Sequence, residues 1–286
     1  MRPRLIGTAW ILDSMRCMGK GAPMPSPSPA RMHSFEVVSN EKIADGIFSL
    51  VISAPELARA IKPGQFVNLA VPGNAMSLLR VPLSYEVADA DVGTVTLWYA
   101  VVGDGTHRLS QMQPGDSSDL LGPGGHGWTI PEGCDRALLV AGGIGVPPVL
   151  CLARELEHAG VSFDVCVGAA TAEKLVGVAD FEALGAASVN VATDDGTAGH
   201  HGFCTDAVQG LLAQNGYSYV ATCGPEPMMA KVAAAANEAG VFCEASLERM
   251  MSCGFGACAT CAVETKSGMK GACMCGPVFD AKEVVW

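Results

Sequence analysis

The stretch Arg136-Ala-Leu-Leu-Val-Ala-Gly-Gly-Ile-Gly145 decides the fold of the second half of the chain. Its apolar residues have the character of a buried strand, and they lead directly into a turn rich in glycine. The next residues, 146–157, have the composition of a helix with proline in its first turn, where no amide donor is needed. Glycines at such a junction let the backbone approach a phosphate group, and the helix N-terminus supplies amide donors. The turn is not the G-x-G-x-x-G fingerprint, so a plain tight turn is the alternative.

Further strands and helices alternate on both sides of this junction. The sequence predicts strands at 163–168, 188–193, 218–223 and 241–247, with helices at 177–184, 205–214 and 226–239. This rhythm is typical of a parallel sheet covered by helices. We therefore predict an α/β nucleotide-binding domain over residues 133–247.

Two more turns are expected at the edge of this sheet where the strands end. Thr222-Cys-Gly-Pro-Glu-Pro-Met-Met229 follows one strand, and Asp194-Asp195-Gly196 follows another. Ligands bind outside the carboxyl ends of parallel strands, so both turns are expected to face one crevice. Two carboxylates there could accept from ribose hydroxyls and would repel a 2′-phosphate, which favours NAD over NADP. The alternative for the turn at Thr222–Met229 is a simple helix start, and the alternative for the turn at Asp194–Gly196 is a solvated turn. The predicted nucleotide-binding residues are Gly142, Gly143, Gly145, Cys223, Gly224 and Pro225.

Residues 34–132 carry signals for short strands separated by Gly/Pro turns. The clearest strand is 94–102, with β-branched and aromatic residues on both faces, and others are expected near 35–38, 47–53 and 65–71. Such a series predicts a small antiparallel barrel. Arg80 could neutralise a pyrophosphate while Ser84 donates to a flavin or a phosphate. The turn Val102-Gly-Asp-Gly-Thr106 could cradle phosphate through backbone amides. A surface arginine on a barrel is the alternative for Arg80.

Four cysteines near the C-terminus have the spacing of a metal cluster. Cys253, Cys258 and Cys261 follow the pattern C-x4-C-x2-C, and Cys273 comes after eleven more residues. This is the plant-type ligand pattern for a [2Fe–2S] cluster, which passes one electron at a time. Zinc sites more often use two close Cys pairs, and disulfide frameworks suit short secreted chains, so these are the weaker alternatives. The segment 248–286 is so rich in Gly and Cys that we expect it to fold around its metal without a core of its own.

Composition narrows the remaining choices. The chain has 286 residues, of which 49% are hydrophobic and 16% are charged, so two domains and an appendage fit. The net charge of −11 argues against nucleic acid and anionic membrane surfaces. No stretch of 18 apolar residues predicts a membrane span. Twelve cysteines without a convincing secretory signal favour a reducing, cytoplasmic location. Residues 1–33, with a Pro/Ser-rich run, are expected to be a flexible leader.

Together these segments resemble the electron-transfer subunits of class B, NAD-dependent dihydroorotate dehydrogenases, a branch of the ferredoxin-reductase-like flavoproteins. The likeness covers residues 33–286 and rests on the order of the motifs. The most specific part is the tail, Ser246–Cys258 with Cys273-Met-Cys-Gly-Pro-Val-Phe-Asp280. The resemblance implies an α+β multi-domain fold: an antiparallel Greek-key β-barrel for FAD, the parallel α/β domain for NAD and a small [2Fe–2S] segment.

The resemblance also assigns cofactor-binding residues. The family's Arg-Pro-x-Ser motif for FAD falls on Val81, Pro82, Leu83 and Ser84. Valine thus occupies the usual arginine position, and the neighbouring Arg80 could reach the same phosphate. The other FAD residues that the resemblance implies are Trp98, Tyr99, Ala100, Gly105 and Thr106. The four cysteines match the cluster ligands one for one, and Cys275 stands where relatives often carry an acidic residue.

The implied activity needs a partner. An FMN-containing subunit would oxidise dihydroorotate, and electrons would pass through the [2Fe–2S] cluster and FAD of this chain to NAD⁺, a step of pyrimidine synthesis. The implied assembly is a heterotetramer of two copies of each subunit. No catalytic side chain is assigned, because a hydride moves directly between stacked rings. The alternatives are a reductase that serves an oxygenase, a hydrogenase or a ferredoxin, and a zinc-bearing redox-sensing interaction protein.

Overall fold

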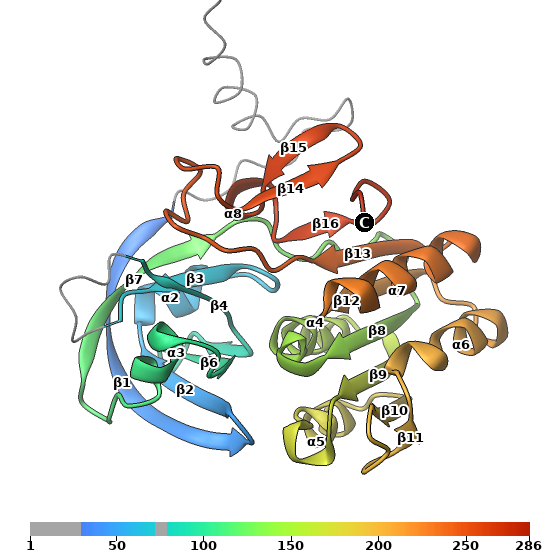
Figure 1. Ribbon diagram of the computed structural model, residues 1–286, viewed down its shortest axis with the longest axis horizontal. Coiled ribbons are helices and arrows are strands. Elements are labelled where there is room, and N and C mark those ends of the chain that lie inside the picture. Colours follow the sequence, from blue (N-terminus) through green and yellow to red (C-terminus); the bar gives the residue numbers. More distant parts are fainter. Residues whose placement is uncertain (1–29, 72–78) are drawn as a thin grey trace, which may run out of the picture.

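The computed structural model describes residues 30–71 and 79–286. In these residues two seven-stranded sheets lie side by side, and the C-terminal segment lies across the top of both (Figure 1). The strands of the first sheet are β1 (Arg31–Ala44), β2 (Ile47–Ser53), β3 (Phe66–Leu69), β4 (Val81–Ser84), β5 (Val87–Asp89), β6 (Thr94–Ala100) and β7 (Ser117–Gly124). Two short helices accompany them, α2 (Pro55–Ala60) and α3 (Asp104–Leu109).

The first sheet is antiparallel and curls around its own core. Its strand order is β4-β3-β7-β1-β2-β6-β5. Burial alternates along β6, where Val95, Leu97 and Tyr99 point into the core, as expected for a strand with one covered face. The predicted strands are confirmed. One boundary differs: residues 31–33, which the sequence placed in the leader, belong to β1 and pair with β7. The rest of the expected leader, residues 1–29, lies outside the described part.

The second sheet contains the predicted α/β alternation. Its strands are β8 (Arg136–Gly142), β9 (Ser162–Ala169), β10 (Ser188–Thr193), β11 (His200–His201), β12 (Tyr219–Cys223), β13 (Phe242–Ser246) and β16 (Val278–Asp280), in the order β11-β10-β9-β8-β12-β13-β16. Its helices are α4 (Val146–His158), α5 (Val178–Ala183), α6 (Val208–Gln214) and α7 (Glu226–Glu238), and three short 3₁₀ turns are η1 (Gly143–Gly145), η2 (Ala172–Lys174) and η3 (Cys204–Asp206).

Helices cover both faces of this sheet because its central strands are apolar on both sides. On β8, Leu138 and Val140 pack with α6 and α7. The alternate residues Ala137, Leu139 and Ala141 pack with α4 and α5. Since successive side chains of a strand point to opposite faces, one apolar run serves two cores.

The C-terminal segment corrects two predictions. It contains the hairpin β14 (Ala262–Thr265) and β15 (Gly268–Gly271), the short helix α8 (Ala272–Cys275) and β16. Strand β16 pairs antiparallel with β13, so the second sheet is mixed and not purely parallel. Val263, Phe279 and Val284 are buried in the same core as α7, so the expectation that this segment lacks a core was wrong. The high Gly and Cys content of this segment led to the wrong expectation, because its few apolar residues lie where they pack against the second sheet.

The two sheets meet along α4. The indole Nε1 of Trp128 donates a hydrogen bond to the carbonyl of Pro148, at 2.7 Å. Thr129 donates its backbone N–H to the buried carboxylate of Glu244, at 2.9 Å. The backbone N–H of Trp128 also donates to the carbonyl of Pro63 on the barrel side, at 3.0 Å, so the residues that connect the barrel to the second sheet are fixed against both. Within the described ranges, no helix is long and apolar enough to cross a membrane.

Candidate functional site

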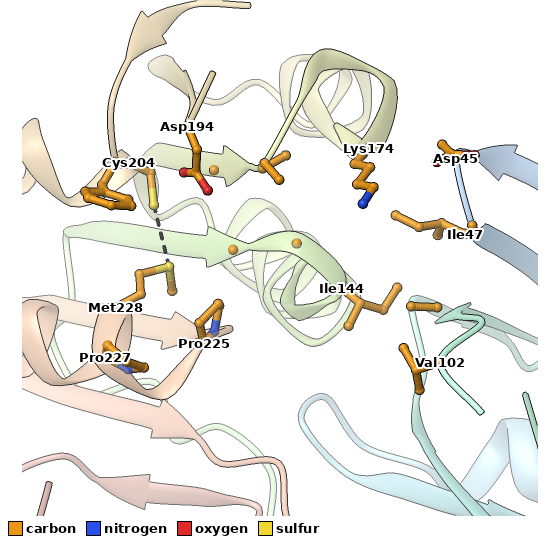
Figure 2. A pocket seen from close by; sticks show the side chains of 18 of the residues that line it. Asp45, Ile47, Val102, Ile144, Lys174, Asp194, Cys204, Pro225, Pro227 and Met228 are labelled. Carbon is orange, nitrogen blue, oxygen red and sulfur yellow. Dashed lines mark hydrogen bonds between the residues drawn. The ribbon is translucent and has the colours of Figure 1, made fainter. Parts of the chain in front are cut away.

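A cavity of about 800 Å³ opens at the carboxyl edge of the second sheet, where it faces the barrel. Asp45, Ile47 and Val102 line it from the barrel side, and Ile144, Lys174 and Met228 are among the residues that line it from the other side (Figure 2). The predicted residues Gly142, Gly143 and Pro225 line this cavity, as does Ala100. The crevice that the strand ends predicted is therefore present, and the barrel forms its second wall.

Close packing of two turns explains three of the predicted glycines. A Cβ on Gly145 would lie 2.3 Å from the carbonyl oxygen of Cys223, and one on Gly224 would lie 2.9 Å from the carbonyl oxygen of Gly142. A Cβ on Gly142 would lie 2.6 Å from Sδ of Met228. These glycines let the turn after β8 touch the turn after β12. Burial raises the pKa of the Cys223 thiol to about 12, so this thiol stays protonated.

Gly143 differs from its neighbours. Its φ is +54°, and a Cβ there would meet nothing within 4 Å. A residue with left-handed backbone and free space, at the wall of the cavity, is the place where a ligand can approach the main chain. Gly143 is therefore the glycine of this turn whose role points toward a ligand.

The two acidic residues after β10 have different surroundings. Asp194 lines the cavity. Asp195 instead accepts hydrogen bonds from the hydroxyl and the N–H of Thr197, at 2.6 and 3.0 Å, and these bonds lower its pKa. Of these two residues, Asp194 is the one that lines the cavity, while Asp195 fixes the turn.

Sequence reasoning missed two cations and an aromatic ring in the cavity wall. Lys174 and Lys231 both line it. The Nζ of Lys231 lies 5.0 Å from the ring centroid of Phe203, whose side chain is 55% exposed. An exposed ring can stack with a base, and lysines can neutralise phosphates. The sequence pattern of alternating strands and helices gave no signal for these three residues, because they lie on η2, α7 and the loop before η3.

On the barrel side, Val81 packs against the turn at Gly105. A Cβ on Gly105 would lie 2.9 Å from Cγ2 of Val81, so β4 and the start of α3 touch there. Thr106 accepts hydrogen bonds from the N–H groups of Val102 and Gly103, at 2.9 and 3.1 Å. Arg80 forms an ion pair with Asp119 at 2.5 Å. The structure thus brings Val81, Gly105 and Thr106 together, while the Arg80 guanidinium is held by a carboxylate.

Alternation along the strands separates the remaining FAD candidates. Tyr99 is buried in the barrel, where its hydroxyl donates to Asn40 at 3.0 Å and burial raises its pKa to about 12. Trp98 and Ala100 point the other way, and Ala100 lines the cavity next to Val102, which is 85% exposed. The tyrosine ring is therefore part of the core. Pro82, Leu83 and Ser84 are half-buried on β4.

The four cysteines of the C-terminal pattern interact with one another. Cys258 interacts with Cys253, and Cys261 hydrogen-bonds with Cys273. Backbone N–H groups donate to two of the sulfurs, Ala257 to Cys253 at 3.3 Å and Cys273 to Cys261 at 3.4 Å. Hydrogen bonds from Thr260 lower the pKa of Cys258 to about 6, which favours the thiolate that binds metal.

The arrangement is compatible with a two-iron cluster. In a [2Fe–2S] cluster each iron takes two of the four protein ligands. Amide donors to the sulfurs are typical of such sites.

Comparisons with known proteins show what the chain is similar to. Residues 248–285 match the family described as the iron–sulfur cluster binding domain of dihydroorotate dehydrogenase B. A solved structure described as an NADH-dependent reduced ferredoxin–NADP oxidoreductase, studied for flavin-based electron bifurcation, is similar, with a TM-score of 0.80 and 31% identity over 93% of this chain and 92% of that one. A ferredoxin NADP⁺ reductase from Neisseria gonorrhoeae, with bound FAD and NADP, shares the fold, with a TM-score of 0.62 and 16% identity over 74% of this chain and 93% of that one.

Similar proteins carry the name dihydroorotate dehydrogenase B (NAD(+)), electron transfer subunit. The protein of Geobacillus thermodenitrificans is 40% identical over 257 residues, which cover 87% of this chain and 96% of the relative. The protein of Desulforamulus reducens is 34% identical over 261 residues, which cover 90% of this chain and 99% of the relative. The chain therefore belongs to the family of electron transfer subunits of dihydroorotate dehydrogenase B.

Proposed function

We propose that this chain takes electrons from an FMN-containing dihydroorotate dehydrogenase subunit and delivers them, through a [2Fe–2S] cluster and FAD, to NAD⁺. When bound, the flavin supplies the exchange between one-electron and hydride chemistry. The barrel, which we interpret as a Greek-key barrel, is the proposed FAD domain (34–132). Residues 133–247 are the proposed NAD domain, and 248–286, which adds β16 to its sheet, is the proposed cluster segment. A cytoplasmic location stays a prediction from the sequence.

The residues of this chain bind the cofactors and orient them. We assign the cluster to Cys253, Cys258, Cys261 and Cys273, because these thiols have the ligand spacing and two of their sulfurs accept hydrogen bonds from backbone N–H groups. The proposed FAD contacts are the outer face of β4, Trp98 and Ala100 on β6, and the Gly105–Thr106 turn. The proposed NAD contacts are Gly143, Asp194 and Pro225 in the cavity. No side chain is assigned to proton transfer.

The observation that carries this proposal is the union of three parts in one chain. The segment that contains the four cysteines adds strand β16 to the second sheet. The barrel forms one wall of the cavity at the edge of that sheet. The partner follows from the names of the relatives, and we propose a heterotetramer with two copies of each subunit. We propose that the dihydroorotate site belongs to the partner subunit.

A visible absorption experiment tests the proposal. The anaerobically purified chain is titrated with NADH, and then with dihydroorotate in the presence and absence of the FMN subunit. We expect flavin and cluster bands that NADH bleaches, and bleaching by dihydroorotate only when the partner is present. A colourless protein that contains zinc would contradict the electron-transfer function.

A second function has one observation in its favour. The similar structure at 31% identity is described as an oxidoreductase for reduced ferredoxin. A reductase with a ferredoxin partner would give the same response to NADH. It would reduce or oxidise a ferredoxin rapidly and would not respond to dihydroorotate with the FMN subunit, so the same titration separates the two functions.

A further inference from the structure

Asn68 lies between the two proposed cofactor sites. It is on β3, opposite Pro82 of β4 and opposite Leu121 of β7. Its neighbours Val67 and Leu69 point into the barrel core. Since side chains alternate along a strand, Asn68 points to the outer face together with Phe66.

The outer face at this point carries the flavin motif. Directly opposed residues of an antiparallel pair lie on the same face, so Pro82 accompanies Asn68, and Ser84 accompanies Phe66. Leu83, between them, packs toward the barrel core. Phe66 itself packs in the core that contains Cys261 and Cys273. The strand pair β3–β4 thus has the flavin motif and the cluster segment on one side.

The cluster-binding loop covers Asn68 directly. A Cβ on Gly254 would lie 1.7 Å from Nδ2 of Asn68 and 2.9 Å from its Cγ. Gly254 also has φ of +75°, so this position favours glycine for two reasons. Gly254 immediately follows the ligand Cys253, and the amide of Asn68 therefore limits where that cysteine can lie.

The carbonyl oxygen of the buried Asn68 amide has no protein partner in the described part of the chain. Asn68 is 2% exposed, and its Oδ1 has no hydrogen-bond partner among the described residues. A buried carbonyl oxygen without a donor is destabilising, whereas an apolar side chain would fill the same space without that cost. The polar residue is thus explained if a bound group supplies the donor. The sulfurs of a cluster only accept hydrogen bonds, while a flavin carries N–H and hydroxyl donors.

We propose that Asn68 is a positioning residue that couples the two sites. Its amide nitrogen holds the Cys253–Gly254 turn of the cluster loop, and its carbonyl oxygen accepts a hydrogen bond from the bound flavin. One rigid side chain thereby fixes the distance between the cluster and the flavin. This inference rests on the proposed function and adds a residue to it.

The test replaces Asn68 with leucine, which has similar volume and no hydrogen bonds. We expect N68L to bind FAD and iron, to shift the flavin absorption bands and to change the electron paramagnetic resonance signal of the reduced cluster. In stopped-flow measurements NADH should bleach the flavin at the normal rate, and cluster bleaching should slow by about tenfold. The matched control is N190L, at a half-buried asparagine of β10 that hydrogen-bonds the Val165 carbonyl; it should leave all these signals unchanged.

A second variant keeps the test decisive if N68L fails to fold. N68D keeps an acceptor and loses the donor end, so it should alter the cluster signal more than the flavin bands. Wild-type spectra and rates in whichever variant folds would overturn the role of Asn68. If the wild-type protein itself binds neither flavin nor iron, the proposed function fails, and that result is distinct from a wild-type-like variant.

Discussion

Glu86, two residues after β4, forms an ion pair with Arg154 of α4 and so ties the barrel to the second sheet. The carboxylate is almost fully buried, and burial raises the pKa of Glu86 even though the Arg154 guanidinium acts in the opposite direction. Tyr85 and Cys151 pack in the same barrel core beside this pair. The flavin motif on β4 and the nucleotide-binding helix α4 are therefore held in a fixed relation by a buried charge.

Removal of Arg154 should destabilise the protein. The Arg154 side chain is 30% exposed, so we expect Arg154→Ala to lower the free energy of unfolding by about 3 kcal/mol, the lower end for a broken buried pair. Denaturant unfolding measures this. The control Lys42→Ala removes an exposed ion pair with Asp45 and should cost about 0.5 kcal/mol or less.

The stability lost in Arg154→Ala should also depend on pH. The folded-state pKa of Glu86 is raised. The favourable contribution of Glu86 to the free energy of unfolding is therefore complete below its unfolded-state pKa, about 4.3. This contribution is lost as the pH rises through its folded-state pKa. Without Arg154 the folded pKa rises further, so Arg154→Ala should lose more stability at pH 8 than at pH 5. Equal losses at both pH values would contradict this account.

Gly143→Ala should weaken NADH binding. Its left-handed backbone makes any Cβ unfavourable by about 1 kcal/mol, and the added methyl would point into the open space of the cavity wall. We expect KM for NADH to rise by about tenfold. Gly240→Ala is the matched control, since Gly240 has φ of +70° and equally free space but lies after α7, away from the cavity. It should lose similar stability with an unchanged KM; a KM rise in both variants would argue against the role of Gly143.

Asp194→Ser should relax the preference for NAD. Asp194 lines the cavity, and its negative charge would repel a 2′-phosphate, whereas Lys174 and Lys231 would tolerate one. We expect the ratio of kcat/KM for NADPH to that for NADH to rise by about tenfold. Asp195→Ser, in the neighbouring turn, should leave the ratio unchanged. A similar rise in both variants would mean that general charge, and not the position of Asp194, sets the preference.

Cys258→Ser should remove the cluster and spare the flavin. Serine is a poor iron ligand, and loss of one of four thiolates should weaken metal binding by at least about tenfold. Iron analysis and absorption spectra of the purified protein measure both cofactors. Cys134→Ser replaces a half-buried thiol outside the C-terminal segment and should keep its iron. Full iron content in Cys258→Ser would exclude this residue as a ligand.

Much of the fold could be predicted because its signals are local. The strand Arg136–Gly142 is apolar on both faces, and the glycine turn and proline that follow it specify a strand-to-helix junction without reference to the rest of the chain. The spacing of the four cysteines is likewise a local property, since three of them come from one short loop. These features made the α/β domain, the antiparallel sheet and the metal segment predictable.

Only the tertiary structure decided which face each candidate takes and what covers it. It turned Tyr99 into the barrel, assigned Asp194 but not Asp195 to the cavity, and joined β16 to β13. It also placed Asn68 under Gly254, far along the chain. Strand periodicity fixes which residues share a face, but the pairing of distant strands and the packing of loops determine which face is covered. These long-range contacts leave no periodic pattern in the sequence. The sequence by itself therefore determined the secondary-structure elements and the motifs, and the three-dimensional packing determined which residues meet in the candidate site.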